Sequence, residues 1–121
     1  MPKIMIVDDA LFMRVSLKKI LSGGGFTDLL EACDGQQACE ICKEERPDLV
    51  LMDISMPNLN GIEALKKIKE IYPETAVIMC SAIGQDSMLV EAIEAGAAEF
   101  IVKPFKPEQI LDAVRKAVDG E

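Results

Sequence analysis

Acidic side chains stand at the ends of two apolar segments of this sequence. Asp8 and Asp9 follow the run Lys3–Val7, and Asp53 closes the run Asp48–Asp53. Crowding carboxylates in a chain of net charge −8 is unfavourable unless a cation lies between them. Oxygen donors without histidine suit a hard ion, and a site with few protein ligands favours Mg²⁺ (or Mn²⁺). The alternative is that these aspartates cap helices or begin turns.

A hydroxyl and a lysine follow two further apolar segments. Ser81 comes directly after Ala76–Cys80, and Lys103 comes directly after Glu99–Val102. A metal ion and an ammonium group can neutralise the oxygens of a transferring phosphoryl group, and a hydroxyl can donate a hydrogen bond to one of them. A carboxylate such as Asp53 can act as the nucleophile and form an aspartyl phosphate. The residue types therefore indicate phosphoryl chemistry.

Short apolar runs alternate along the chain with amphipathic stretches of helical period. We predict strands at Lys3–Val7, Thr27–Ala32, Asp48–Asp53, Ala76–Cys80 and Glu99–Val102, and helices at Leu11–Leu21, Gln36–Glu45, Gly61–Tyr72, Asp86–Ala95 and Pro107–Val118. This alternation predicts a doubly wound α/β fold, a five-stranded parallel sheet with helices on both faces. Ligands bind at the carboxyl ends of such strands. The first and third strands are neighbours only in the flavodoxin-like order 2-1-3-4-5, which is common but not dictated by these patterns.

The composition limits the class of protein. A length of 121 residues fits one domain, expected over 1–121, and 50% hydrophobic residues suffice for a core. The low pI of about 4.6 argues against direct binding of nucleic acid. We find neither a targeting segment nor a membrane span, and we interpret the four cysteines as reduced thiols of a cytoplasmic protein.

Two local motifs have simpler explanations than chemistry. Cys39 and Cys42 have the spacing of a redox or metal motif, but they fall in the middle of a predicted helix and the chain has no histidine, so packing is favoured. Phe12 follows the first acidic pair closely. It is either a satellite of the core or part of a docking surface beside the site.

The sequence resembles the receiver domains of two-component response regulators over essentially its whole length. The matching motifs are VDDA (Val7–Ala10), LMDISMPNLNG (Leu51–Gly61), CSAIG (Cys80–Gly84) and EAGAAEFIVKPF (Glu94–Phe105). Within the family it is most similar to the single-domain chemotaxis regulators, especially through VDDALFMR and FIVKPF. The resemblance implies the strand order 2-1-3-4-5.

The resemblance also implies a role for each site residue. Asp53 accepts the phosphoryl group, and Mg²⁺ is bound by Asp8, Asp9, Asp53 and the backbone carbonyl of Ser55. Phosphate is contacted by Ser81, Ala82 and Lys103, and the Lys103–Pro104 peptide is cis. Ser81 and Phe100 form the switch. The switch aromatic is often tyrosine in this family, so Phe100 lacks the phenol that would make an output hydrogen bond.

The implied partners are a sensor histidine kinase of the chemotaxis type upstream and the flagellar motor switch or another output protein downstream, with a separate phosphatase also possible. The resemblance implies a monomer whose own chemistry is limited to self-phosphorylation and slow autodephosphorylation. One alternative is the receiver domain of a longer DNA-binding regulator or a phosphorelay intermediate. Another is an aspartyl phosphatase, which is disfavoured because Ser55 stands where its general acid is expected.

Overall fold

The protein was analysed as a computed structural model, which describes residues 2–54, 60–82 and 87–119. The strands are β1 (Ile4–Val7), β2 (Leu29–Ala32), β3 (Leu49–Asp53), β4 (Ala76–Ser81) and β5 (Glu99–Val102). The helices are α1 (Leu11–Gly23), α2 (Gly35–Glu45), α3 (Gly61–Ile71), α4 (Ser87–Glu94) and α5 (Pro107–Asp119). All ten predicted elements are present, and no boundary differs from its prediction by more than two residues. Asp86, the predicted start of α4, lies outside the described residues.

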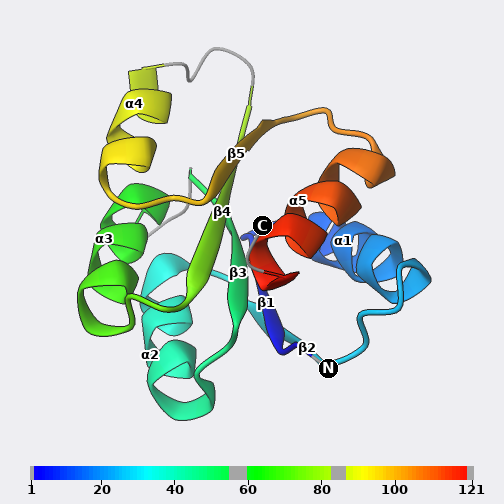
Figure 1. Cartoon of the computed structure of the whole chain (residues 1–121), viewed down its shortest axis with the longest axis horizontal. Helices are drawn as coiled ribbons and strands as arrows, with labels where there is room; N and C mark the ends of the chain where they lie inside the picture. The colour runs from blue at the N-terminus through cyan, green and yellow to red at the C-terminus, as the bar shows by residue number, and fades with distance from the viewer. Residues whose placement is uncertain (1, 55–59, 83–86, 120–121) are drawn as a thin grey trace.

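The five strands form one parallel sheet in the order β2-β1-β3-β4-β5, so the predicted fold class is confirmed. β1 and β3 lie side by side, with Val7 opposite Met52. Figure 1 shows α1 and α5 on one face of the sheet and α2, α3 and α4 on the other. This arrangement brings the carboxyl ends of β1, β3, β4 and β5 to the same edge.

The boundary of β2 differs from the prediction for a physical reason. β2 begins at Leu29, not at Thr27, because its partner β1 begins opposite at Ile4. Just before that pair, the Ile4 amide donates a hydrogen bond to the Asp28 carbonyl, 3.0 Å away, which joins the two segments. A strand needs a neighbouring ladder, and apolar character alone does not extend it.

The run of three glycines ends α1 as predicted. Gly25 has a φ of +93°, which is a left-handed conformation that favours glycine. The amide of Phe26 donates to the Leu21 carbonyl at 2.9 Å and that of Gly25 to the Ser22 carbonyl at 3.1 Å. This pair of bonds is a Schellman motif, so the glycines serve as a helix stop.

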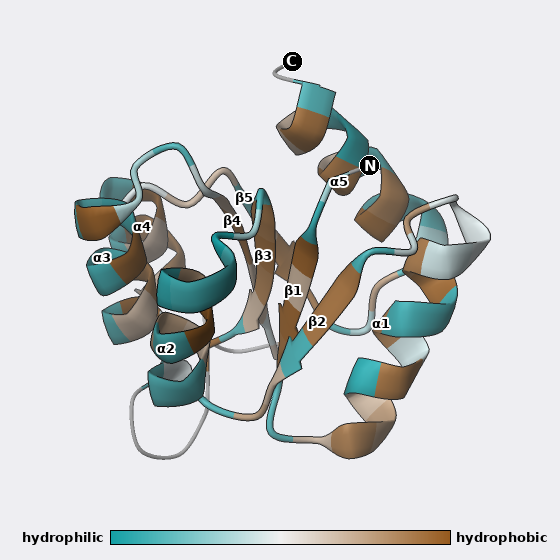
Figure 2. Ribbon diagram, turned by 90° about the horizontal axis from the view of Figure 1, so that it is seen from below, coloured by the Kyte–Doolittle hydropathy of each residue, from teal (hydrophilic) through white to brown (hydrophobic). Residues whose placement is uncertain are grey.

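The hydrophobic core has two layers, one on each face of the sheet. Figure 2 shows the apolar strands between helices whose outer faces are hydrophilic. Under α1 and α5 lie Ile4, Ile6, Leu49, Leu51 and Ile78, and under α2, α3 and α4 lie the alternate residues Met5, Val7, Val50, Met52, Val77 and Met79. Because successive side chains of a strand point to opposite faces, both layers are filled by the same strands. No described helix is long and apolar enough to cross a membrane.

Candidate metal and phosphoryl site

The three predicted aspartates converge at the carboxyl edge of the sheet. Asp8, Asp9 and Asp53 each offer one carboxylate oxygen, and these atoms all lie within 4.8 Å of one another. Asp8 and Asp53 are buried, whereas Asp9 is exposed. Buried like charges at this separation repel one another strongly, so the cluster has the electrostatics of a cation site.

The backbone around Asp8 is held by the neighbouring strand and by a local turn. The Asp8 amide donates to the Ala32 carbonyl of β2 at 3.1 Å. The Ala10 amide donates to Asp8 Oδ1 at 2.9 Å, so this carboxylate also shapes the start of α1. The turn-forming alternative thus describes part of what Asp8 does, because its side chain closes a turn and also joins the acidic cluster. Asp8 does not cap α1, whose N-cap is Ala10.

Lys103 reaches into the same cluster from the end of β5. Its Nζ lies 3.3 Å from Asp8 Oδ2 and 3.5 Å from Asp53 Oδ1. Burial by itself lowers the pKa of Lys103, but the attraction of Asp53 and Asp8 outweighs it and the pKa is raised above its usual range. The ammonium group therefore stays charged at neutral pH. The Lys103–Pro104 peptide bond is cis, as the resemblance implied.

β4 ends one residue later than predicted, so Ser81 is its last residue, and the Ser81 side chain is buried. Among the described residues its Oγ is the one buried side-chain polar atom without a hydrogen-bond partner. Its carbonyl accepts from the Lys103 amide at 2.6 Å, which ties the end of β4 to the start of the Lys103 segment. Ala82 follows as an exposed residue. A buried hydroxyl without a partner can bond an incoming ligand at little cost.

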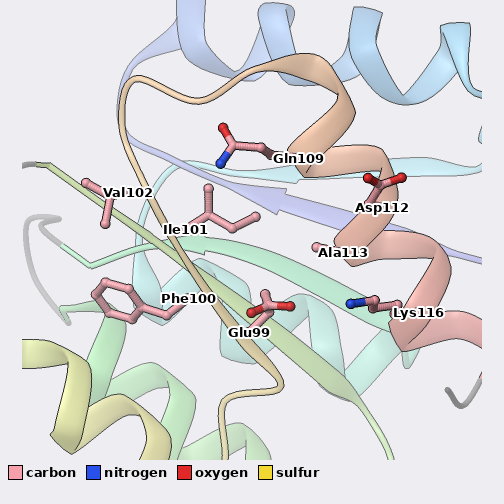
Figure 3. A pocket seen from close by; sticks show the side chains of 8 residues that line it. All are labelled: Glu99, Phe100, Ile101, Val102, Gln109, Asp112, Ala113 and Lys116. Atoms are coloured by element: carbon pink, nitrogen blue, oxygen red, sulfur yellow. The ribbon is translucent and has the colours of Figure 1, made fainter.

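Two aromatic residues lie near the site in different environments. Phe100 is half-buried and packs against the core layer under α2, α3 and α4. Figure 3 shows its ring on the α4 side of β5, away from the α5 side chains. Phe12 is 72% exposed, so it is a surface residue and the core alternative for it is wrong.

Gly61 contributes to the site in a way that sequence reasoning missed. Its amide donates to the Ile54 carbonyl at 2.8 Å. A Cβ at this position would lie 2.2 Å from the carbonyl oxygen of Asp53 and 2.8 Å from the Cα of Ile54. Glycine is therefore required for α3 to begin against the backbone of Asp53. The sequence signal was a glycine directly after Asn60, the helix N-cap whose side chain accepts from the Glu63 amide. Ser55, the remaining predicted ligand, lies outside the described residues.

Three of the four cysteines, Cys39, Cys42 and Cys80, are at least partly buried, whereas Cys33 is exposed. Burial raises the pKa of the Cys42 thiol to about 12, and it raises the pKa of Cys39 as well. Cys80 is buried beside the site and its pKa is also raised to about 12 by burial. Protonated thiols are poor nucleophiles and poor metal ligands, which agrees with the packing interpretation of Cys39 and Cys42.

The parallel sheet and the acidic cluster at its carboxyl edge fit a single family of known proteins. Residues 4–115 match the family described as response regulator receiver domain. The chain belongs to this family, and it is a CheY-like receiver domain of the two-component type.

Individual relatives cover nearly the whole chain. It is 53% identical over 117 residues to the chemotaxis protein CheY of Bacillus subtilis, which covers 97% of this chain and 98% of that protein. It is 41% identical over 114 residues to the sporulation initiation phosphotransferase F of the same organism, covering 94% and 91%. A receiver domain protein from Clostridium thermocellum superposes with a TM-score of 0.93 at 29% identity, covering 99% and 96%. CheY is a standard example of the strand order 2-1-3-4-5. The prediction of this order therefore rested on the family resemblance and not on the apolar patterns alone.

The donor set fits the metal that receiver domains typically bind. The cluster offers carboxylate oxygens alone, which are the ligands of Mg²⁺, and three ligands leave coordination positions for water or phosphate. Lys103 supplies a second positive charge beside them. The described residues of the site thus fit Mg²⁺ by chemistry and by spacing.

Proposed function

We propose that this chain, as a single receiver domain over 1–121, is a cytoplasmic phosphorylation switch with Asp53 as phosphoacceptor. The observation that carries this proposal is the convergence of three carboxylates and one ammonium group at one edge of the sheet. Asp53 joins the cluster from the central strand β3. The family membership supports the same reaction.

In the proposed reaction an oxygen of the ionised Asp53 carboxylate attacks the phosphorus of a phosphohistidine on a sensor kinase. The new O–P bond forms as the P–N bond breaks, and the imidazole leaves with its electron pair. Slow attack of water on the phosphorus later releases inorganic phosphate and restores the carboxylate. Neither step needs an oxidant or a reductant, because the phosphorus keeps its oxidation state.

Each neighbouring group has a proposed role in that transfer. Asp8, Asp9, Asp53 and the Ser55 carbonyl would hold Mg²⁺, which would neutralise charge on the phosphoryl oxygens. The Lys103 ammonium binds one of those oxygens, and its raised pKa keeps it cationic at neutral pH. The Ser81 hydroxyl donates to another, which would satisfy its unpartnered Oγ. Ala82 contributes to the phosphate-binding segment.

The switch is proposed to connect the site to the surface of α4, β5 and α5. Ser81 moving towards the phosphate opens space into which the Phe100 ring turns. Figure 3 shows the groove between β5 and α5, lined by Glu99, Phe100, Ile101, Val102, Gln109, Asp112, Ala113 and Lys116. Val90 and Ile93 on α4 are exposed apolar residues. This surface would bind the output partner differently in the two states.

We further propose that the protein is a monomer acting in chemotaxis, between a chemotaxis-type histidine kinase and the flagellar motor switch. Support comes from the 53% identity to a chemotaxis protein over almost its full length. The alternative is a phosphorelay intermediate or a receiver of a longer DNA-binding regulator. The 41% identity to a sporulation initiation phosphotransferase supports the phosphorelay alternative.

The phosphoacceptor is tested by labelling with acetyl phosphate and Mg²⁺, read as an 80-Da mass increase, the mass that one phosphoryl group adds. Asp53→Asn should abolish the increase, and Asp48→Asn, at the other end of β3, should label like the wild type. Labelling of Asp53→Asn at the wild-type rate would refute the assignment.

The output is tested by binding measurements with beryllofluoride and Mg²⁺ as the phosphate mimic. A motor-switch peptide should bind more tightly to the treated protein than to the untreated one. Binding of a phosphotransfer domain alone, with no response to the motor-switch peptide, would favour the phosphorelay alternative.

A further inference from the structure

Arg14 lies on the first turn of α1, close to the acidic cluster, and has no role in the function proposed above. Its Nη1 donates to the backbone carbonyl of Asp8 at 2.6 Å. Its Nε donates to Glu31 Oε1 at 3.0 Å. The side chain is 16% exposed, so both contacts are made by a guanidinium group that is largely shielded from water.

The carbonyl that Arg14 contacts belongs to the peptide between the two neighbouring aspartates. Fixing this oxygen fixes the plane of the peptide that links Asp8 to Asp9, and with it the direction in which both carboxylates leave the backbone. Two other hydrogen bonds among the described residues restrain this turn, from the Asp8 amide to the Ala32 carbonyl and from the Ala10 amide to Asp8 Oδ1. Neither of these restrains the carbonyl.

Glu31 on β2 holds Arg14 in this position. Lys18, one turn further along α1, donates to the other oxygen of the same carboxylate at 3.1 Å. The hydrogen bond from Lys18, together with that from Arg14, lowers the pKa of Glu31. The carboxylate is therefore ionised at neutral pH and orients the planar fork of the arginine, which can reach two acceptors at once.

We propose that Arg14 is a positioning residue for the metal site, holding the Asp8–Asp9 peptide so that both carboxylates face the ion. The proposal rests on the proposed Mg²⁺ site. Loss of a group that orients the metal ligands without touching the ion typically weakens metal binding on the order of tenfold or more.

The sign of the effect separates this role from simple electrostatics. Arg14 places a positive charge near a site for a cation, so removing that charge alone should strengthen Mg²⁺ binding. Loss of positioning should weaken it. A purely stabilising contact between α1 and β2 should leave the affinity of the folded protein unchanged.

Lys18 offers a matched control. Arg14→Gln and Lys18→Gln each remove one positive charge and one partner of Glu31, but only Arg14 contacts Asp8. Mg²⁺ affinity would be measured by calorimetric titration with MgCl₂ on protein shown by urea denaturation to be fully folded. In parallel, hydrogen exchange of the Ala10 amide would be measured in metal-free protein.

We expect Arg14→Gln to weaken Mg²⁺ binding on the order of tenfold and to speed exchange at Ala10, with Lys18→Gln unchanged in both. Arg14→Lys, which keeps the charge but not the fork, should lie between wild type and Arg14→Gln. Equal or tighter Mg²⁺ binding by Arg14→Gln, or equal losses in both glutamine variants, would overturn the proposal. Failure of the wild type to bind Mg²⁺ would instead refute the proposed metal site, and the Ala10 measurement would still test Arg14.

Discussion

Polar and charged groups are paired differently at the two ends of the sheet. At the amino end, the Lys3 amide donates to Asp48 Oδ2 at 2.8 Å and Lys3 Nζ donates to Glu45 at 3.1 Å. The buried Thr75 hydroxyl donates to the Pro47 carbonyl at 3.2 Å. These charged and polar groups are paired and join neighbouring loops.

The carboxyl end brings three carboxylates close together, those of Asp8, Asp9 and Asp53. Among the described residues, Lys103 forms ion pairs with two of them, Asp8 and Asp53. Ser81 is buried there with its hydroxyl unpartnered. At the amino end these groups hydrogen-bond to one another and stabilise the fold. At the carboxyl end, carboxylates lie close together and the Ser81 hydroxyl has no partner among the described residues, so this end can bind a ligand. Substitutions at matched positions of the two ends should therefore give different results.

The largest difference is expected between the two lysines. Lys103→Met removes the side-chain cation that pairs with Asp8 and Asp53. Labelling by acetyl phosphate should therefore slow on the order of 100-fold, as when a preorganised electrostatic group is lost. Lys3→Met removes an exposed cation at the other end and should label at the wild-type rate. Equal rates for all three proteins, by mass spectrometry over time, would contradict a role for Lys103.

Two glycines give the next comparison. Gly61→Ala places a methyl group against the Asp53 backbone and should lower the free energy of unfolding by about 1–3 kcal/mol. At Gly23, in the last turn of α1, a Cβ meets nothing within 4 Å, so Gly23→Ala should raise it by about 0.5–1 kcal/mol. Urea denaturation measures both. Loss of stability only at Gly23 would mean that the close approach of α3 to β3 is wrong.

Neutralising one acid should have opposite effects at the two ends. In metal-free protein Asp9→Ala relieves repulsion within the cluster and should stabilise by about 1 kcal/mol. Asp48→Ala loses the hydrogen bond to the Lys3 amide and should destabilise by about 1 kcal/mol. Thermal unfolding with and without MgCl₂ provides the check, because Mg²⁺ should stabilise the wild type more than Asp9→Ala. Destabilisation by Asp9→Ala without metal would argue against crowded charge.

The smallest expected effect is a pH dependence. The pKa of Lys103 is raised above its ordinary value of 10.5, so its contribution to stability is fully present below pH 10.5 and is lost as pH rises through the higher folded-state value. The stability difference between wild type and Lys103→Met should therefore be constant from pH 7 to 9 and shrink above pH 10.5. A difference that stays constant up to pH 12 would show that the ion pairs contribute nothing.

Much of the fold was predictable because its signals are local. The apolar runs and helical periods located all ten elements, and Asp8, Asp53 and Lys103 could be placed at strand ends from their neighbours alone. The predicted start of β2 was wrong because a strand begins where its pairing with a neighbour begins. No local sequence pattern records that position. Phe12 was left open for a similar reason, since its exposure depends on what packs over α1.

The sequence by itself determined which residue types stand at the ends of the apolar strands: Asp8, Asp9 and Asp53, with Ser81 and Lys103, in a chain without histidine. Only the tertiary structure decided that one oxygen from each of Asp8, Asp9 and Asp53 lies within 4.8 Å of the others, that Gly61 allows α3 to begin against Asp53, and that Arg14 contacts the Asp8 carbonyl. Residue type and period are properties of short segments. Distances between segments far apart in the chain depend on strand order and register, which the whole sheet sets at once.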